Sequence, residues 1–206
     1  MNLCNYQKRY ILFDYPACRV EGDFMDSEKD KNMIRAFRKE DMETLCAIAK
    51  RAYAGIFSGF EKQIGRDALD IWMPDAENSR SVLLKQIAEK HPEWLHVCER
   101  NGKIVGFIMF QLDYDRKLGT INSNAADPLA GEKGVGHEMY TFALDYFQKQ
   151  GMKMAMVHTG LDEAHAPARK AYERMGFDRK LPEVLYFKML DGADGKDDCS
   201  AEGNQP

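Results

Sequence analysis

The sequence predicts an α+β protein with a mixed, mostly antiparallel central sheet that is flanked by helices. Strand-like and helix-like patterns follow one another without a regular βαβ repeat, and three consecutive strand patterns form an antiparallel meander. We expect one domain over residues 33–190, which is long enough to bury a sizeable core. Residues 1–32 are expected to form an arm that is disordered or comes from an upstream start, and residues 191–206 a disordered acidic tail.

The first half of the domain contains one strand and then helices. The alternation in Met33–Arg38 predicts a strand. Asp41 is expected to cap a helix whose apolar positions recur at helical spacing as far as Ile56. Pro74 and the polar residues up to Ser79 break the next apolar stretch, and a further helix is expected over Ser81–Lys90.

The meander follows these helices. Leu95–Arg100 and Lys103–Leu112 have strand patterns, and they are separated by Asn101-Gly102, the favoured pair for a two-residue type I′ turn. A third strand pattern returns over Thr120–Ala126. We therefore expect three neighbouring antiparallel strands before the glycine-rich segment.

The second half alternates helices with strands. The helix after the glycines is expected to end at Gly151, and Met152–Thr159 predicts a strand. A further helix begins near Pro167 and ends before Gly176, and Glu183–Leu190 predicts a last strand. The apolar face of the first of these helices is formed by Val135, Met139, Phe142, Ala143, Tyr146 and Phe147.

The bulk composition excludes several classes of protein. With 44% hydrophobic residues, 30% charged residues and a net charge of −4, the chain has an ordinary globular composition. No apolar run approaches the roughly 20 residues of a membrane helix, and the slight acidity argues against nucleic acid as a partner. The five cysteines include no Cys-x-x-Cys pair, so we predict no metal site, and a reducing cytoplasm is the expected location.

The glycine-rich segment is a candidate anion site. Gly134-Val135-Gly136 opens a helix, and a helix start has N–H groups without internal partners and a partial positive charge. The two glycines lack a Cβ, so a diphosphate can approach the backbone closely, and Lys133 adds a positive charge at the rim. A loop in which the glycines only make a turn is an equally good interpretation of this segment alone.

The glycine-rich segment does not match the two common nucleotide-binding motifs at their required positions. A Walker A loop needs Lys-Ser/Thr where the chain has His137-Glu138, and a dinucleotide-binding fold needs a third glycine where it has Met139.

One tyrosine lies between a helix start and a helix stop. Tyr172 follows Pro167 and precedes Gly176-Phe177. Phe177 can fold back on Tyr172 at the helix end, which gives the tyrosine a packing role. Alternatively, the phenol can protonate a thiolate that leaves during acyl transfer.

Together the two segments resemble the GNAT superfamily of N-acetyltransferases. The family pattern Gln/Arg-x-x-Gly-x-Gly/Ala is matched at Gly134 and Gly136, while Gly131 replaces the usual Gln or Arg and Glu132 adds a carboxylate. The run 162–177 resembles a subgroup with Asp-x-x-His-x-Pro-Ala-Arg before Tyr and Gly-Phe.

The resemblance implies a GNAT-like fold in which two strands splay apart at a cofactor slot, with acetyl-CoA as the co-substrate. A primary amine of a small-molecule or peptide acceptor would attack the thioester directly, and Tyr172 would be the general acid. A backbone N–H near a strand bulge at Asn124–Ala126 would stabilise the oxyanion. The cofactor-binding residues that the resemblance implies are Asn124, Ala125, Ala126, Gly131, Glu132, Lys133, Gly134, Val135, Gly136, His137, His165 and Ala168.

The general base and the acceptor side are less defined. The family often has a Glu on the strand before the glycines, whereas residues 120–124 contain no carboxylate. The candidate bases elsewhere in the chain are His158 and Glu99. His158 has a suitable intrinsic pKa, although a strand-end histidine is more commonly a solvated residue. The first two helices are expected to supply the acceptor side, with Tyr53, Phe57, Phe60 and Trp72 as aromatic lining and Asp67, Asp70 and Asp75 available to attract a cationic amine.

A non-catalytic acyl-CoA-binding or sensor protein of the same fold is the alternative function. We expect a monomer or a homodimer.

Overall fold

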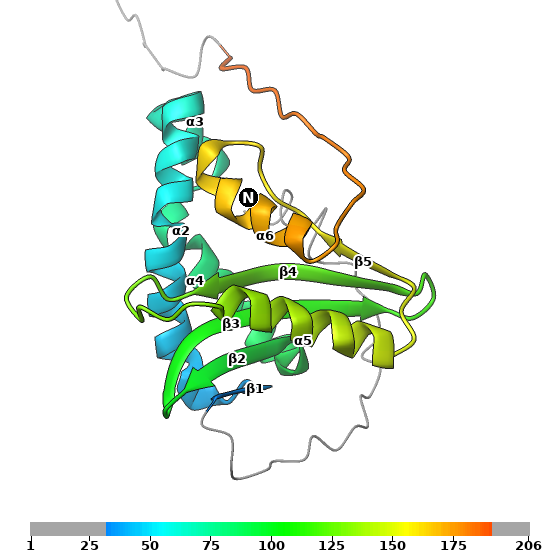
Figure 1. Cartoon of the computed structure of the whole chain (residues 1–206). Coiled ribbons are helices and arrows are strands. Elements are labelled where there is room, and N and C mark those ends of the chain that lie inside the picture. The colour runs from blue at the N-terminus through cyan, green and yellow to red at the C-terminus, as the bar shows by residue number, and fades with distance from the viewer. Residues whose placement is uncertain (1–31, 191–206) are drawn as a thin grey trace, which may run out of the picture.

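The computed structural model describes residues 32–190, and these form one five-stranded sheet in the order β1-β2-β3-β4-β5 (Figure 1). The first four strands pair antiparallel, and β5 pairs parallel to β4. The predicted α+β class with a mixed, mostly antiparallel sheet is confirmed. The predicted arm and tail lie, apart from Asn32, outside the described residues. The strands are β1 Asn32–Ala36, β2 Leu95–Arg100, β3 Lys103–Asp113, β4 Leu118–Ala126 and β5 Met154–Val157.

Helices cover both faces of the sheet (Figure 1). On one face α2 and α4 pack against β2 and β3 through a buried cluster that includes Leu45, Leu84 and Phe107. On the other face α5 and α6 pack through a second cluster that includes Met139 and Tyr172. The helices are α2 Met42–Ile64, α3 Arg66–Trp72, α4 Ala76–Lys90, α5 Val135–Lys149 and α6 Ala166–Arg174, with short 3-10 turns η1 Lys39–Asp41, η2 Pro92–Trp94 and η3 Glu163–His165.

The turn chemistry of the sequence is confirmed at the β2–β3 hairpin. Asn101 and Gly102 both have positive φ, 50° and 73°, as a type I′ turn requires. The end of α5 also follows the prediction, since the helix stops at Lys149 and Gly151 adopts a φ of 74°.

Asp41 does not cap the first long helix through its side chain. The carboxylate instead accepts hydrogen bonds from the Arg35 guanidinium at 2.8 and 3.0 Å and from the Arg38 N–H at 2.7 Å. The predicted cap is therefore wrong, because a half-buried ion pair to β1 occupies both oxygens.

The helix predicted from Ser81 begins earlier, at Ala76. Asp75 takes a left-handed φ of 56° after Pro74, so the preceding turn ends there. Ser79 then donates a hydrogen bond of 2.7 Å to the carbonyl of Ala76. The polar residues of this stretch form a first helical turn, and the break that their composition predicted is confined to Pro74 and Asp75.

The strand predicted over Glu183–Leu190 is absent from the structure. Residues 178–190 form neither helix nor strand, and after α6 the segment runs in extended form toward α3 (Figure 1). Tyr186 is 93% exposed, and Phe187 packs edge-on against Trp72 at 5.2 Å between ring centroids. The prediction relied on the β-propensity of residues 183–190. A strand also needs a hydrogen-bonded neighbour, and this segment has none among the described strands.

None of the helices within residues 32–190 is long and apolar enough to cross a membrane.

Gly119 in β4 shows how closely α5 packs on the sheet. A Cβ at this position would overlap the ring of Phe147 on α5. We expect Gly119→Ala to lower the free energy of unfolding by about 1–3 kcal/mol through overpacking. Gly55→Ala is the matched control, because Gly55 lies on α2 with nothing within 4 Å of an added Cβ, and alanine favours a helix by about 1 kcal/mol. Urea unfolding of both variants checks this, and equal stability would contradict the packing.

Candidate active site

The candidate site is built around the place where β4 and β5 part. The two strands pair only between Leu118–Ile121 and Met154–Val157. Beyond that point β4 continues to Ala126, whereas β5 ends. The register between β3 and β4 also shifts here, which leaves Asn122 as an extra residue in β4. Such a bulge bends and twists its strand, so the bulge and the gap between β4 and β5 coincide.

The bulge was predicted near Asn124–Ala126, and this position is wrong by a few residues. Asn124, Ala125 and Ala126 pair with β3 in regular register, opposite Ile108, Phe107 and Gly106. The extra residue is Asn122, because the register shift falls between the partners Met109↔Ser123 and Phe110↔Ile121. Residues Asn124–Ala126 still border the gap, since no β5 residue pairs with them.

Polar atoms without partners collect at this gap. The Oδ1 and Nδ2 atoms of Asn122 and the Oγ1 atom of Thr159 are buried and have no hydrogen-bond partner among residues 32–190. A buried polar atom left unpaired costs roughly 1–3 kcal/mol, so an arrangement of this kind marks a place where water or a ligand completes the hydrogen bonds.

The start of α5 has no side-chain cap, so it stays a candidate anion site. Gly134 adopts a φ of 85° immediately before the helix, and no side chain caps this end. Residues 131–134 are exposed and Gly136 is half-buried, whereas Val135 points into the core. The first-turn N–H groups therefore face no capping side chain, and the missing Cβ atoms leave the backbone approachable. Lys133 and His137 are exposed beside it.

The carboxylate of Glu132 is neutralised by an arginine that the sequence motif does not contain. Nη1 of Arg100, at the end of β2, donates to Glu132 Oε2 at 2.7 Å and to the Lys133 carbonyl at 3.1 Å. Nη2 pairs with Glu138 on α5. The Arg100 side chain is only 11% exposed. Sequence reasoning missed Arg100 because it lies 32 residues before its partner and belongs to another element.

Tyr172 lies in the second core cluster and supports the end of α6. The Phe177 N–H donates to the Tyr172 carbonyl and the Gly176 N–H to the Glu173 carbonyl, both at 3.1 Å, and Gly176 has a φ of 87°. This is the predicted Schellman ending, and the rings of Tyr172 and Phe177 meet at 5.9 Å. The predicted packing contact is confirmed.

The hydroxyl of Tyr172 is directed toward polar groups on α5 and β4. It interacts with the Tyr140 hydroxyl, which in turn accepts a hydrogen bond of 2.8 Å from Asn124 Nδ2. Burial raises the pKa of Tyr172 far above its usual value, and the neighbouring Tyr140 raises it further. The phenol is therefore protonated at neutral pH.

Tyr53 extends this polar chain to the opposite face of the sheet. Its hydroxyl lies 2.9 Å from Ser123 Oγ and donates to the Asn124 carbonyl at 3.1 Å. Helix α2 is tied to the same end of β4 by Arg51, which pairs with Asp127 at 2.7 and 3.0 Å. Tyr53, one of the four aromatic residues predicted for the acceptor side, thus contacts β4 beyond its pairing with β5.

The Asp-x-x-His-x-Pro-Ala-Arg run holds the loop that joins β5 to α6. Nη1 of Arg169 donates to the carbonyls of Gly160 at 2.7 Å and Asp162 at 2.6 Å. His165 Nδ1 lies 2.6 Å from Asp162 Oδ2, and its ring packs on Phe60 of α2 at 6.0 Å. The structure thus places His165 against α2, with one ring nitrogen already engaged. Ala168 packs beside the second core cluster.

His158 follows β5 at the mouth of the gap, and its side chain is exposed. Packing around part of the ring lowers the pKa of His158, and the neighbouring His165 and Arg80 lower it as well, whereas Glu183 raises it. The imidazole is accordingly neutral at pH 7 and able to accept a proton.

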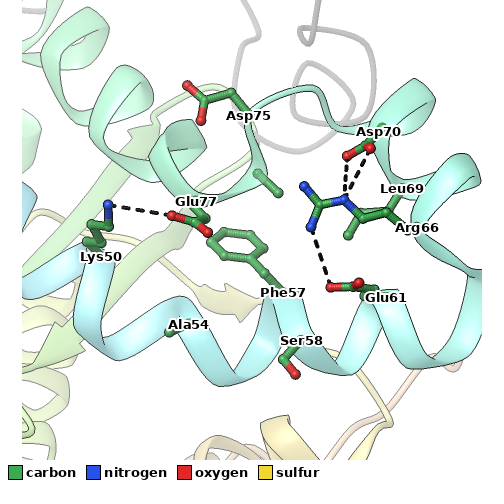
Figure 2. A pocket seen from close by; sticks show the side chains of 11 residues that line it. Lys50, Ala54, Phe57, Ser58, Glu61, Arg66, Leu69, Asp70, Asp75 and Glu77 are labelled. Atoms are coloured by element: carbon green, nitrogen blue, oxygen red, sulfur yellow. Dashed lines mark hydrogen bonds and ion pairs between the residues drawn. The ribbon is translucent and has the colours of Figure 1, made fainter.

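A separate cavity of about 450 Å³ lies between α2, α3 and the start of α4 (Figure 2). Its charged residues are largely paired with one another, Arg66 with Asp70 at 3.0 Å and Lys50 with Glu77 at 3.5 Å. No residue of β4, α5 or α6 lines it. The structure therefore separates Asp70 and Asp75 from the gap. Its lining residues are Lys50, Ala54, Phe57, Ser58, Glu61, Arg66, Leu69, Asp70, Asp75, Ala76 and Glu77.

Comparison with known proteins places this arrangement in a family. Residues 61–177, more than half of the chain, match the model of the Acetyltransferase (GNAT) family. The chain belongs to this family. A solved structure, the PaiA N-acetyltransferase of Thermoplasma acidophilum in complex with coenzyme A, is similar with a TM-score of 0.58 and 17% identity, over 74% of this chain and 92% of that one. This likeness shows the GNAT fold.

Curated relatives are N-acetyltransferases of different kinds. A mycothiol acetyltransferase of Thermomonospora curvata is 30% identical over 95 residues, which are 46% of this chain and 31% of that protein. The chain thus spans about a third of the length of this relative. An S-(2-succino)cysteine N-acetyltransferase of Bacillus subtilis is 24% identical over 160 residues, 75% of this chain and 89% of that protein.

The role of Arg169 in this GNAT protein can be tested without any ligand. We expect Arg169→Met to leave two loop carbonyls unpaired, to lower the free energy of unfolding by about 1–2 kcal/mol, and to accelerate amide hydrogen exchange selectively over residues 160–165. Arg174→Met on the same helix is the control, because Arg174 is exposed. Exchange that is uniform across the domain, or identical in both variants, would contradict a local role.

Proposed function

We propose that this protein is an acetyl-CoA-dependent N-acetyltransferase that acetylates a primary amine by direct attack on the thioester. One observation carries the proposal: the uncapped start of α5 and the buried Tyr172 hydroxyl both lie beside the gap between β4 and β5. Family membership supports it, and so does the fold shared with a neighbour solved with coenzyme A.

The residues at the gap fit the coenzyme. The backbone N–H groups at the start of α5 would hold its diphosphate, with Lys133 at the rim and Arg100 keeping the nearby carboxylates neutralised. The glycine conformation at Gly134 fits the same purpose, since a Cβ there would be strained. Acetyl-CoA would supply the acetyl group as a thioester, whose C–S bond breaks as the new N–C bond forms.

The chain's own groups would then manage the protons and the charge. Tyr172 would give its proton to the departing sulfur, so that coenzyme A leaves as a thiol. The amine would release one proton to His158 or to water, and the phenolate would regain one proton from solvent. Backbone N–H groups of β4 beyond Asn122, which lack a β5 partner, would stabilise the negative charge on the carbonyl oxygen.

A second function, a non-catalytic acyl-CoA-binding protein, is favoured by one specific observation. Residues 120–124 of β4 carry no carboxylate that could act as a base. Calorimetric titration with acetyl-CoA, combined with thiol release over a panel of amines, separates the two functions. Binding with turnover supports the enzyme, and binding without turnover on any amine supports the sensor. The S-(2-succino)cysteine N-acetyltransferase relative supports a small-molecule amine as the acceptor class.

Replacing the phenol tests the acid role. We expect Tyr172→Phe to lower the rate of thiol release by about 10²-fold or more, with little change in the Kd for acetyl-CoA, because the ring packing stays in place. Tyr186→Phe is the matched control, since Tyr186 is 93% exposed. Thiol release and calorimetry check both variants. An unchanged rate in Tyr172→Phe would restrict this residue to packing.

Removing the guanidinium tests the charge balance at the phosphate site. We expect Arg100→Met to weaken acetyl-CoA binding by about 10-fold, because Glu132 and Glu138 then place uncompensated negative charge beside the α5 start. Adding Glu132→Gln and Glu138→Gln to Arg100→Met should restore most of the affinity. Calorimetry at low ionic strength measures this. Failure of the triple variant to recover affinity, in a protein that melts like the wild type, would contradict the electrostatic explanation.

A further inference from the structure

Arg80 on α4 carries a positive charge that no described residue neutralises. Its guanidinium lies over the ring of Tyr53, with 4.7 Å from Cζ to the ring centroid. Its Nε atom is buried and has no hydrogen-bond partner among residues 32–190, and no ion pair within this range includes Arg80. The arginine is thus positioned by an aromatic ring and offers unused donors.

Such an arrangement points to an anionic ligand. A guanidinium stays charged at any physiological pH, and its planar fork of donors matches a carboxylate in two parallel hydrogen bonds. Burying a charge without a partner is unfavourable. In the rest of the described chain, arginines near the site, such as Arg51 and Arg100, hold carboxylates at 2.7 Å.

Its contact with Tyr53 places Arg80 beside β4, at the end that continues past β5. Tyr53, on which it stacks, is hydrogen-bonded to Ser123 and Asn124 of β4. The charge of Arg80 also acts on His158, which follows β5. The guanidinium therefore lies on the side of β4 where Tyr53 meets Ser123 and Asn124, which is the part of β4 that has no β5 partner.

Arg80 approaches the gap from the face opposite to the coenzyme groups. Tyr53 packs with the cluster of α2 and α4, whereas Tyr140 and Tyr172 belong to the cluster of α5 and α6. A ligand on the Arg80 side would meet the α5 side only through the gap. An acceptor could therefore place its amine in the gap while its anionic group stays on the Arg80 side of the sheet.

We propose that Arg80 binds a carboxylate of the acceptor, so that the substrate class is an amine with a carboxylate close to the amino group, as in an α-amino acid or its conjugate. This inference rests on the proposed function and deepens it. It excludes a polycationic acceptor, because an unpaired guanidinium at the entrance repels positive charge. The carboxylates of the separate cavity between α2, α3 and α4 are largely paired with Lys50 and Arg66 (Figure 2).

The test compares amines that differ only in the carboxylate. Thiol release is measured with a panel of free amino acids and with the matching amino-acid amides, for instance L-methionine against L-methioninamide, and with spermidine as a polycation. We expect free acids to have a kcat/KM at least about 10-fold higher than the matching amides. Arg80→Met should remove this preference, and Arg80→Lys, which keeps a point charge without the fork, should retain part of it.

A second arm measures binding without turnover. Calorimetry with the N-acetylated forms of the same acids and amides, in the absence of coenzyme, should show acids binding to the wild type and not to Arg80→Met. Arg66→Met is the matched control, because Arg66 is exposed in the neighbouring cavity and pairs with Asp70; it should leave both readouts unchanged. Melting curves confirm that each variant is folded.

The outcomes separate the two proposals. Equal use and equal binding of acids and amides, a preference for spermidine, or an acid preference that survives in Arg80→Met overturns the role of Arg80. Absence of any response to acids in both arms overturns it as well. If acids bind through Arg80 but no amine is acetylated, the acceptor site stands and the enzymatic function fails.

Discussion

The candidate site depends on the short pairing between β4 and β5, which extends over four residue pairs and then stops. Parallel pairing stops at Ile121 and Val157, where the bulge at Asn122 bends β4. The loop after β5 is held from the side of α6, where Arg169 donates to the carbonyls of Gly160 and Asp162. If β5 paired with β4 as far as Ala126, there would be no gap between the two strands. The unpaired polar atoms of Asn122 and Thr159 lie where this pairing stops.

Arginines set the charge around this gap. Arg51 ties α2 to Asp127 just after β4, which brings Tyr53 onto the strand. Arg100 ties β2 to the loop before α5 and cancels the carboxylate that the sequence places beside the anion site. Each of these pairs joins elements that are distant in the chain, so each positions the backbone as well as neutralising charge. Arg80 differs because its position is fixed by stacking, which leaves its hydrogen-bonding groups for another molecule.

The sequence predicted those features that depend on neighbouring residues. The type I′ turn at Asn101-Gly102, the glycine-led start of α5 and the Schellman ending at Gly176 each follow from local backbone chemistry, and the structure contains all three. Features that depend on distant partners were missed or misplaced. The carboxylate of Asp41 pairs with Arg35 and does not cap the helix. The partners of Arg100 lie in another part of the chain. The bulge at Asn122 is set by the register with β3. The strand predicted over Glu183–Leu190 is absent for the same reason, because strand pairing depends on a distant partner and not on the segment alone.

The packing of Tyr172, which the structure shows, is compatible with the proposed role of its hydroxyl as an acid. The Schellman ending fixes the backbone of Tyr172 through the Phe177 N–H, and edge-on packing against Tyr140 at 5.2 Å fixes the ring. A side chain so constrained directs its hydroxyl toward the Tyr140 hydroxyl, which accepts a hydrogen bond from Asn124 on β4. The burial that makes the ring a core residue is also what raises the pKa of the phenol and keeps its proton in place. The packing at this helix end and the proposed proton donation therefore place compatible demands on the same side chain.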